Sequence, residues 1–162
     1  MARVILALGT NLGDRVKNLR SAHEALGADF ELGNCSRVYE TQPAYVPNQP
    51  RYYNQICLAA TQWPPLEVLH RLKTIETEIG RVPSVRYGPR LIDLDLLFYD
   101  DLVMDGPDLV LPHPRLAERA FVLVPLAEVA PDLVHPRLQL TVAQLLARLG
   151  DTRGAVWPAE RQ

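Results

Sequence analysis

Lysine is almost absent from this 162-residue sequence, which carries only Lys17 and Lys73 among its 17 basic residues. The net charge is −2, and this weakly acidic balance argues against non-specific nucleic-acid binding, which depends on a basic surface. No apolar stretch approaches the length of a membrane-spanning helix. The first apolar run, Val4 to Leu8, is too short for the apolar segment of a signal peptide. We therefore expect a cytoplasmic protein that binds neither nucleic acid nor membranes.

Cysteine is also scarce. The spacing of the two cysteines, Cys35 and Cys57, matches no common metal or redox motif, so we interpret them as small buried hydrophobic residues of a reducing compartment. No repeat, low-complexity tract or linker divides the chain, and its length suffices for one hydrophobic core. The sequence therefore predicts a single domain spanning residues 1–162, with a loose tail after Gly150.

The most informative segment is 88–95, which reads Gly-Pro-Arg-Leu-Ile-Asp-Leu-Asp. Side chains alternate along a β-strand, so Asp93 and Asp95 share one face, about 6–7 Å apart along the strand. The opposite face is expected to be apolar and to carry Ile92, Leu94, Leu96 and Phe98. Two carboxylates this close repel each other, which favours a cation between them. Mg²⁺ is commonly held in this way by one or two carboxylates together with substrate phosphates.

Three arginines, Arg81, Arg86 and Arg90, stand just before this strand. Guanidinium groups suit two-pronged contacts with phosphate, so carboxylates and arginines together indicate nucleotide-dependent phosphoryl chemistry. Alternating acidic and apolar residues also describe an ordinary half-solvated strand. That alternative gives no reason for the neighbouring arginines.

The remaining segments predict a ferredoxin-like α+β fold with an antiparallel sheet and the order β-α-β-β-α-β. Two helices are expected, one ending at Gly27 and one running from Pro65 to Ile79 with Gly80 as its stop. Asp100 and Asp101 predict a tight hairpin turn. Later segments, including a closing helix at 142–149, would cover the second face of the sheet and complete a three-layer αβα sandwich. The expected strands are 3–8, 31–39, 54–61, 92–98 and 102–104, with a long loop at 41–51.

Glu76 interrupts the apolar stripe of the second helix. Placing residues 100° apart puts its carboxylate between Leu69 and Leu72, whereas every other charge lies outside the stripe. Burying a lone carboxylate is costly, so Glu76 needs a partner, a ligand or an opening in the core. Alternatively, this end of the helix protrudes beyond the sheet and Glu76 reaches water.

Seven motifs occur in order, and together they resemble the 6-hydroxymethyl-7,8-dihydropterin pyrophosphokinase family over nearly the whole chain. This family moves a diphosphate from ATP to a pterin alcohol in folate synthesis, releasing AMP. The run Gly-Pro-Arg-x-x-Asp-x-Asp is the most specific of the motifs. The motifs occupy residues 9–13, 39–43, 52–54, 80–81, 86–95, 112–113 and 119–126.

The resemblance implies a role for each matching position. Asp93 and Asp95 match a pair that binds two Mg²⁺ ions, and Arg81 and Arg90 match catalytic arginines of a mobile loop that closes on the phosphates. The segment from Gly80 to Pro89 is expected to form the lid. The pterin pocket is matched by Thr41, Pro43, Tyr52, Asn54, Tyr87 and Phe121. Positions around ATP are matched by Glu76, Arg86, His113 and Arg119. The resemblance further implies ATP and the pterin as substrates. Independently of the resemblance, we expect a monomer.

Two other classes of protein share this fold. A regulatory small-molecule-binding module would have no use for Asp93, Asp95 and the arginine loop together. An RNA-binding module carries basic charge and places aromatic residues on its central strands. Because neither would cleave ATP, formation of AMP separates both from the enzyme.

Overall fold

The computed structural model describes residues 1–41, 50–80 and 91–159. It contains the helices α1 (Arg15–Asp29), α2 (Pro65–Ile79), α3 (Ala120–Val129) and α4 (Val142–Arg148), and a 3₁₀ turn at Leu116–Glu118. Its strands are β1 (Ala2–Thr10), β2 (Glu31–Cys35), β3 (Tyr39–Thr41), β4 (Tyr52–Thr61), β5 (Asp93–Tyr99), β6 (Met104–Asp105), β7 (Val110–Leu111) and β8 (Val156–Pro158).

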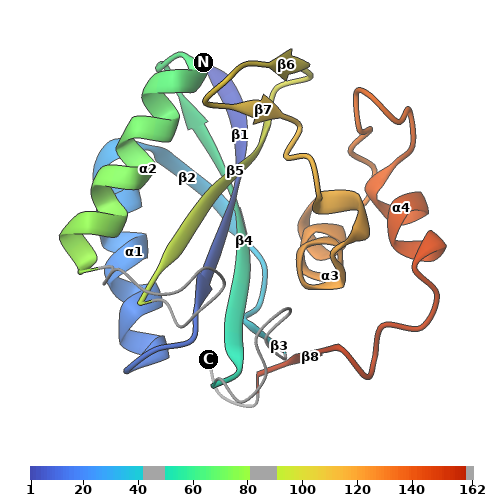
Figure 1. Ribbon diagram of the computed structural model, residues 1–162, viewed down its shortest axis with the longest axis horizontal. Helices are drawn as coiled ribbons and strands as arrows, with labels where there is room; N and C mark the ends of the chain where they lie inside the picture. The colour runs from blue at the N-terminus through green and yellow to red at the C-terminus, as the bar shows by residue number, and fades with distance from the viewer. Residues whose placement is uncertain (42–49, 81–90, 160–162) are drawn as a thin grey trace.

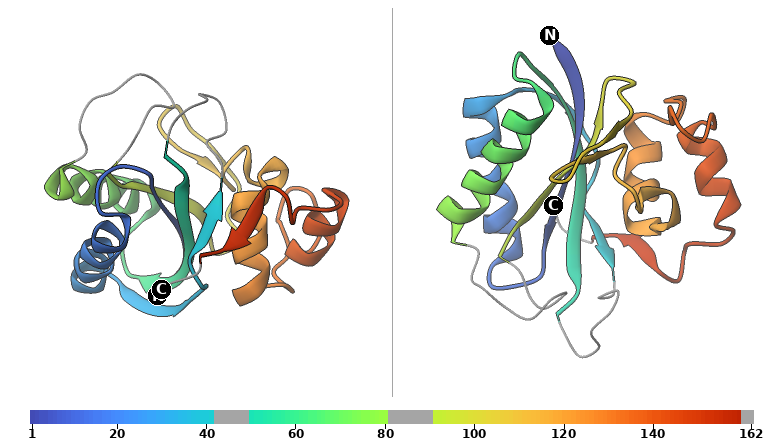
Figure 2. Two further views of the ribbon diagram at one scale, coloured as in Figure 1. Left: turned by 90° about the horizontal axis from the view of Figure 1, so that it is seen from below. Right: turned by 45° about the horizontal axis from the view of Figure 1, so that its top comes forward.

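The main sheet has the order β5-β1-β4-β3-β8, with β2 pairing alongside β3 on the same side of β4. All its strand pairs are antiparallel. Helices α1 and α2 cover one face, and α3 and α4 cover the other (Figures 1 and 2). A separate hydrophobic cluster fills the space on each side of the sheet. The predicted ferredoxin-like core with a third layer is therefore confirmed.

Local sequence signals explain the ends of the two core helices. The Asp14 side chain accepts a hydrogen bond from the backbone N–H of Lys17 and so caps α1. Gly27 does not end this helix as predicted, because α1 continues to Asp29 in the regular helical conformation. Helix α2 follows the prediction, with Pro65 in its first turn and Gly80 as a left-handed stop at φ 100°.

Strand β5 contains a bulge that changes which face its later residues occupy. Leu6 of β1 pairs with Leu96, whereas Ile5 pairs with Phe98, so one residue of β5 is extra. Leu94 and Leu96 pack toward α1 and α2, but Leu97 and Phe98 both pack toward α3 and α4. The prediction that Phe98 shares a face with Leu94 was therefore wrong. Simple alternation fails at an inserted residue.

Three further expectations need correction. The predicted strand at 31–39 is divided into β2 and β3. No hairpin with β5 follows Asp100, because its side chain and backbone bond to Arg3 of β1, and β6 pairs with β7. The tail is not loose over its described part, since β8 pairs with β3.

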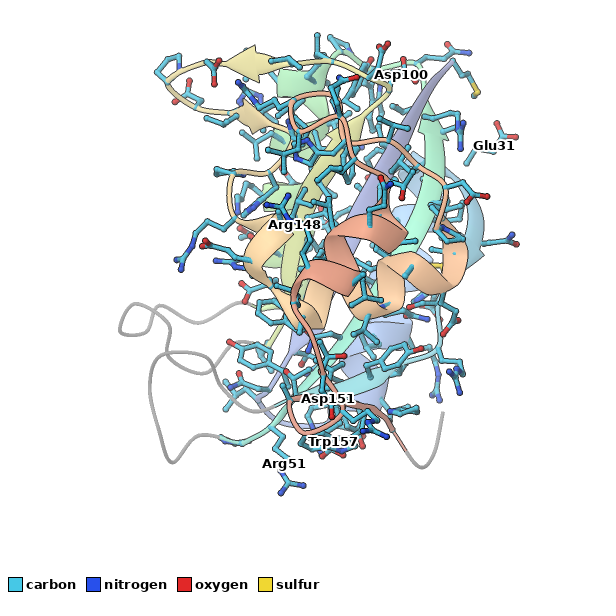
Figure 3. All side chains as sticks on the ribbon, turned by 90° about the vertical axis from the view of Figure 1, so that its right-hand side faces the viewer. Glu31, Arg51, Asp100, Arg148, Asp151 and Trp157 are labelled. Atoms are coloured by element: carbon cyan, nitrogen blue, oxygen red, sulfur yellow. A yellow bond between two sulfur atoms is a disulfide. The ribbon has the colours of Figure 1, made fainter. Side chains whose placement is uncertain are left out.

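The far end of the chain is also held by side chains. The Arg51 guanidinium lies 5.2 Å from the centre of the Trp157 ring, and the two residues lie together at one end of the molecule (Figure 3). The indole N–H of Trp157 donates to Glu40 on β3. Among the described residues, no helix is both long and apolar enough to cross a membrane.

Candidate active site

One row across the main sheet brings the predicted pterin and metal positions together. Gly9 of β1 pairs with Asn54 of β4 on one side and with Asp93 of β5 on the other. Ala7, two residues earlier, lies directly beside Asp95. Neighbouring strands are about 4.8 Å apart, so the backbones of Asn54 and Asp93, which stand on either side of β1, are roughly 10 Å apart across the sheet. All these residues point toward the α3 layer, so an amide and two carboxylates flank a strip of small residues.

Gly9 keeps this strip open. A Cβ atom at this position would lie 3.3 Å from the Asn54 side-chain oxygen and 3.7 Å from the Tyr52 ring. Gly9 and Ala7 stand on the same face of a strand whose other face carries Leu6 and Leu8 in the core. This role of Gly9 and Ala7 was not predicted from the sequence. The signal that could have revealed it is the decreasing size of the residues along one face of β1.

The amide of Asn54 has a fixed orientation. Its Nδ2 donates a hydrogen bond of 2.9 Å to the hydroxyl of Thr41 on β3, so its Oδ1 faces Gly9. Both residues are buried, and Tyr52 pairs directly with Thr41 across the strands. An oriented acceptor beside an aromatic ring is suited to a flat ligand that carries N–H groups.

Arg119 and Phe121 stand at the start of α3, in the helix layer that faces this strip. The Arg119 guanidinium carbon lies 5.5 Å from the centre of the Phe121 ring. Within the described parts of the chain, the buried Nε of Arg119 has no hydrogen-bond partner. A buried donor left unpaired costs about 1–3 kcal/mol, so this guanidinium is suited to an anionic ligand.

His113 lies close enough to Asp95, Arg115 and Arg119 for their charges to act on its imidazole. Its backbone N–H donates to the carbonyl oxygen of Leu97 on β5, which fixes it next to the strand. Burial lowers the pKa of His113, and the charges of Arg119 and Arg115 lower it further, whereas Asp95 opposes the shift. His113 is therefore held neutral near pH 7. With Nδ1 accepting from the backbone of Arg115, the imidazole hydrogen is on Nε2.

Asp93 and Asp95 point to the same face of the sheet, as predicted, and both are partly exposed. Their oxygen donors fit Mg²⁺, which takes one or two protein carboxylates and fills its remaining positions with water or phosphate oxygens. The sheet register fixes the spacing of the two side chains without any contribution from a metal.

The carboxylate of Glu76 is paired within the protein. Its side chain is only 3% exposed, and one oxygen accepts a hydrogen bond of 2.7 Å from the backbone N–H of Leu94. The other oxygen lies 3.4 Å from the ammonium group of Lys73. The alternative in which Glu76 reaches water beyond the sheet is therefore wrong. Leu94 stands between Asp93 and Asp95, so Glu76 holds the backbone that carries both carboxylates.

The structure thus brings eight of the predicted site residues to one region, and Glu76 supports it from behind. The eight are Thr41, Tyr52, Asn54, Asp93, Asp95, His113, Arg119 and Phe121. The predicted positions Pro43, Arg81, Arg86, Tyr87 and Arg90 lie outside the described residues, as do most of the predicted 41–51 loop and of the expected phosphate lid.

Comparison with known families agrees with this geometry. The 7,8-dihydro-6-hydroxymethylpterin-pyrophosphokinase (HPPK) family matches residues 5–131. The chain belongs to this family. A 2-amino-4-hydroxy-6-hydroxymethyldihydropteridine pyrophosphokinase of Synechocystis is 42% identical to this HPPK chain over 156 residues, covering 95% of the chain and 78% of the relative. The corresponding protein of Aquifex aeolicus is 40% identical over 136 residues, covering 84% of the chain and 85% of the relative. The predicted family is confirmed.

Other relatives are much longer. The folic acid synthesis protein fol1 of Pneumocystis carinii is 40% identical over 91% of this HPPK chain, but the match spans only 20% of that protein. Among solved structures, an HPPK-DHPS in complex with substrates has a TM-score of 0.82 and 14% identity, covering 97% of this chain and 46% of that one. The Plasmodium falciparum HPPK-DHPS with pteroate has a TM-score of 0.77 and 17% identity, covering 91% of this chain and 44% of that one. These structures support the fold.

Proposed function

We propose that this HPPK chain transfers diphosphate from ATP to 6-hydroxymethyl-7,8-dihydropterin, giving AMP and the pterin diphosphate for tetrahydrofolate synthesis. The observation that carries the proposal is the row Asn54–Gly9–Asp93, which sets an oriented amide and a carboxylate on either side of a residue without a side chain. One substrate binds at each end of this row. The pterin hydroxyl and the ATP phosphates then meet over the strip of small residues.

The pterin occupies the end near β3. Asn54 accepts from the pterin N–H groups, and the Thr41 hydroxyl keeps the amide from rotating. Phe121 stacks on one side of the ring system, and Tyr52 lines the floor beside Gly9. Pro43 and Tyr87 complete the pocket in this proposal, with Tyr87 stacking on the opposite side of the pterin from Phe121.

ATP occupies the end near β5. Asp93 and Asp95 would hold two Mg²⁺ ions, which would supply charge neutralisation at the phosphate oxygens. Arg119 donates to those oxygens from the start of α3, and neutral His113 donates through Nε2. Arg81 and Arg90 stabilise the transferring group from the loop, Arg86 contributes to ATP binding, and Glu76 supports the strand.

The pterin hydroxymethyl oxygen attacks the β-phosphorus, and the bond between the β-phosphorus and the oxygen bridging to the α-phosphate breaks. AMP leaves with that oxygen. The protein contributes mainly positioning and charge stabilisation, which phosphoryl transfer requires more than covalent chemistry. We further propose that the protein is a cytoplasmic monomer.

The test is product analysis with ATP, Mg²⁺ and 6-hydroxymethyl-7,8-dihydropterin. We expect equal amounts of AMP and pterin diphosphate, and no ADP. Asn54→Ala should raise KM for the pterin about tenfold or more with little change for ATP, and Arg119→Ala should do the reverse. Pterin binding without AMP formation would instead favour the non-catalytic binding module. Formation of ADP would contradict attack at the β-phosphorus.

A further inference from the structure

Cys35 and Cys57 form a disulfide, contrary to the prediction of two separate buried hydrophobic residues. They pair directly across β2 and β4, with Cα atoms 4.1 Å apart. The next pair, Ser36 and Ile56, carries the backbone hydrogen bond, so the cysteines occupy a non-hydrogen-bonded position of the ladder, where side chains lie closest. No sequence spacing signals this contact, because it depends on the strand register.

The two cysteine residues differ in their exposure to solvent. Cys57 is fully buried on the central strand β4, whereas Cys35 is partly exposed on the edge strand β2. An external thiolate can therefore reach Cys35, and Cys57 becomes the leaving group. Thiol–disulfide exchange depends on which sulfur is attacked and on how well the leaving thiolate is stabilised.

A third group stands beside the leaving sulfur. His23 of α1 places its Nε2 at 4.0 Å from the Cys57 sulfur and at 2.7 Å from Oε1 of Gln55. The Gln55 amide nitrogen donates to the carbonyl oxygen of Ser36, which fixes the amide with its oxygen toward His23. Nε2 of His23 therefore carries a hydrogen. In the oxidised protein this N–H is donated to Gln55, and its nitrogen lies 4.0 Å from the sulfur on which negative charge develops during reduction.

We propose that Cys35, Cys57 and His23 form a redox site that exchanges with small-molecule thiols and disulfides. In the reducing direction, a thiolate bonds to the Cys35 sulfur, the Cys35–Cys57 bond breaks, and its electron pair moves to Cys57 beside the His23 N–H. A second thiol then attacks the mixed disulfide and releases Cys35. Two thiols are oxidised to one small disulfide and the protein gains two cysteine thiols. The oxidising direction is the reverse.

The disulfide controls how firmly β2 is attached. This strand has a bulge between Leu32 and Cys35, and β4 is its only partner strand in the described structure. Reduction removes the covalent link beside the Ser36–Ile56 hydrogen bonds and leaves β2 held by its ladder and its packing against α1. From the entropy of the closed loop, we expect reduction to lower the unfolding midpoint by about 5–10 °C.

The experiment equilibrates the full chain in mixtures of reduced and oxidised glutathione, denatures it so that buried thiols can react, alkylates the free thiols and measures the intact mass. We expect a two-state change between no alkylated cysteine and two, with a midpoint set by the glutathione ratio. Cys57→Ser should leave a Cys35 that takes up one glutathione, whereas Cys35→Ser leaves a buried Cys57 that does not. If either variant fails to fold, the wild-type titration alone decides.

The role of His23 is tested by the rate of reduction. His23→Leu should slow it about tenfold, and His23→Gln, which retains an N–H donor, should restore part of the rate. Two outcomes would overturn the proposal. One is a pair that is alkylated twice at every glutathione ratio. The other is an equivalent of Zn²⁺ in the purified protein with both thiols reduced, since the ligand atoms of these three residues lie within 4.8 Å of one another. The outcome does not depend on whether diphosphate transfer occurs.

Discussion

The contact between Glu76 and the backbone of β5 makes a strong prediction about the strand that carries Asp93 and Asp95. Within the described parts of the chain, strand β5 forms one end of the main sheet, and no further strand pairs with its outer backbone groups. The N–H of Leu94 is satisfied by the Glu76 carboxylate at 2.7 Å. Replacing Glu76 with Ala removes this acceptor. The backbone of Leu94, which connects Asp93 to Asp95, then loses the hydrogen bond that holds it in place.

The expected loss of stability follows from the burial of the hydrogen bond between Glu76 and the backbone N–H of Leu94. An unsatisfied buried N–H costs about 1–3 kcal/mol. The ion pair with Lys73 adds no more than about 1 kcal/mol, because the Lys73 side chain is 51% exposed. We therefore expect Glu76→Ala to lower the free energy of unfolding by about 2–3 kcal/mol. Glu76→Gln keeps an acceptor oxygen and should lose only about 1 kcal/mol.

The assay combines urea unfolding with the Mg²⁺ dependence of AMP formation. Glu76→Ala should raise the Mg²⁺ concentration needed for half-maximal activity and lower kcat roughly tenfold, since small displacements of reacting groups are costly. Glu76→Gln should stay close to wild type. Glu78→Ala, an exposed carboxylate on the same helix, is the matched control and should change neither quantity. If Glu76→Gln is as damaging as Glu76→Ala, the negative charge acts directly and the role of Glu76 as an acceptor for Leu94 is refuted.

Four further substitutions test other parts of the site and fold. Asp93→Asn and Asp95→Asn should each reduce AMP formation roughly 100-fold or more while thermal unfolding stays within a few degrees, and a collapsed midpoint with normal activity would refute the assignment. Gly9→Ala should raise the Kd for the pterin about tenfold by displacing the Asn54 amide, with stability changed by less than about 1 kcal/mol, as calorimetry and urea unfolding would show. Burial lowers the pKa of His135 below its usual value, so the unfolded chain takes up the proton first and stability falls as pH drops below about 6.5. His135→Asn should flatten this dependence between about pH 5 and 7 in urea titrations, and an unchanged slope would contradict it.

Predictions from the sequence succeeded where the signal is local. The two-residue period of a strand placed Asp93 and Asp95 on one face, and Pro65 and Gly80 marked both ends of α2. The position of Glu76 within an apolar stripe correctly indicated an unusual environment. Its partner is a backbone group of another element, however, and no side-chain pattern reveals such a group.

Predictions failed where the structure depends on contacts between distant segments. The bulge in β5 moved Phe98 to the opposite face, and only the register with β1 reveals the extra residue. The Cys35–Cys57 contact likewise arises from strand pairing. Gly27 lies inside α1 because the packing of Leu26 in the core outweighs the modest cost of a helical glycine.

The edges of the main sheet have a consequence for contacts between molecules. An uncovered edge strand offers its backbone groups to another chain and so promotes aggregation. At one end of this sheet Glu76 occupies the outward N–H of Leu94. At the other end the short strand β8 contains Pro158, which has no N–H to offer. Glu76, which supports the site, therefore also protects one edge of the sheet, so Glu76→Ala should increase light scattering during refolding as well as raise the Mg²⁺ requirement.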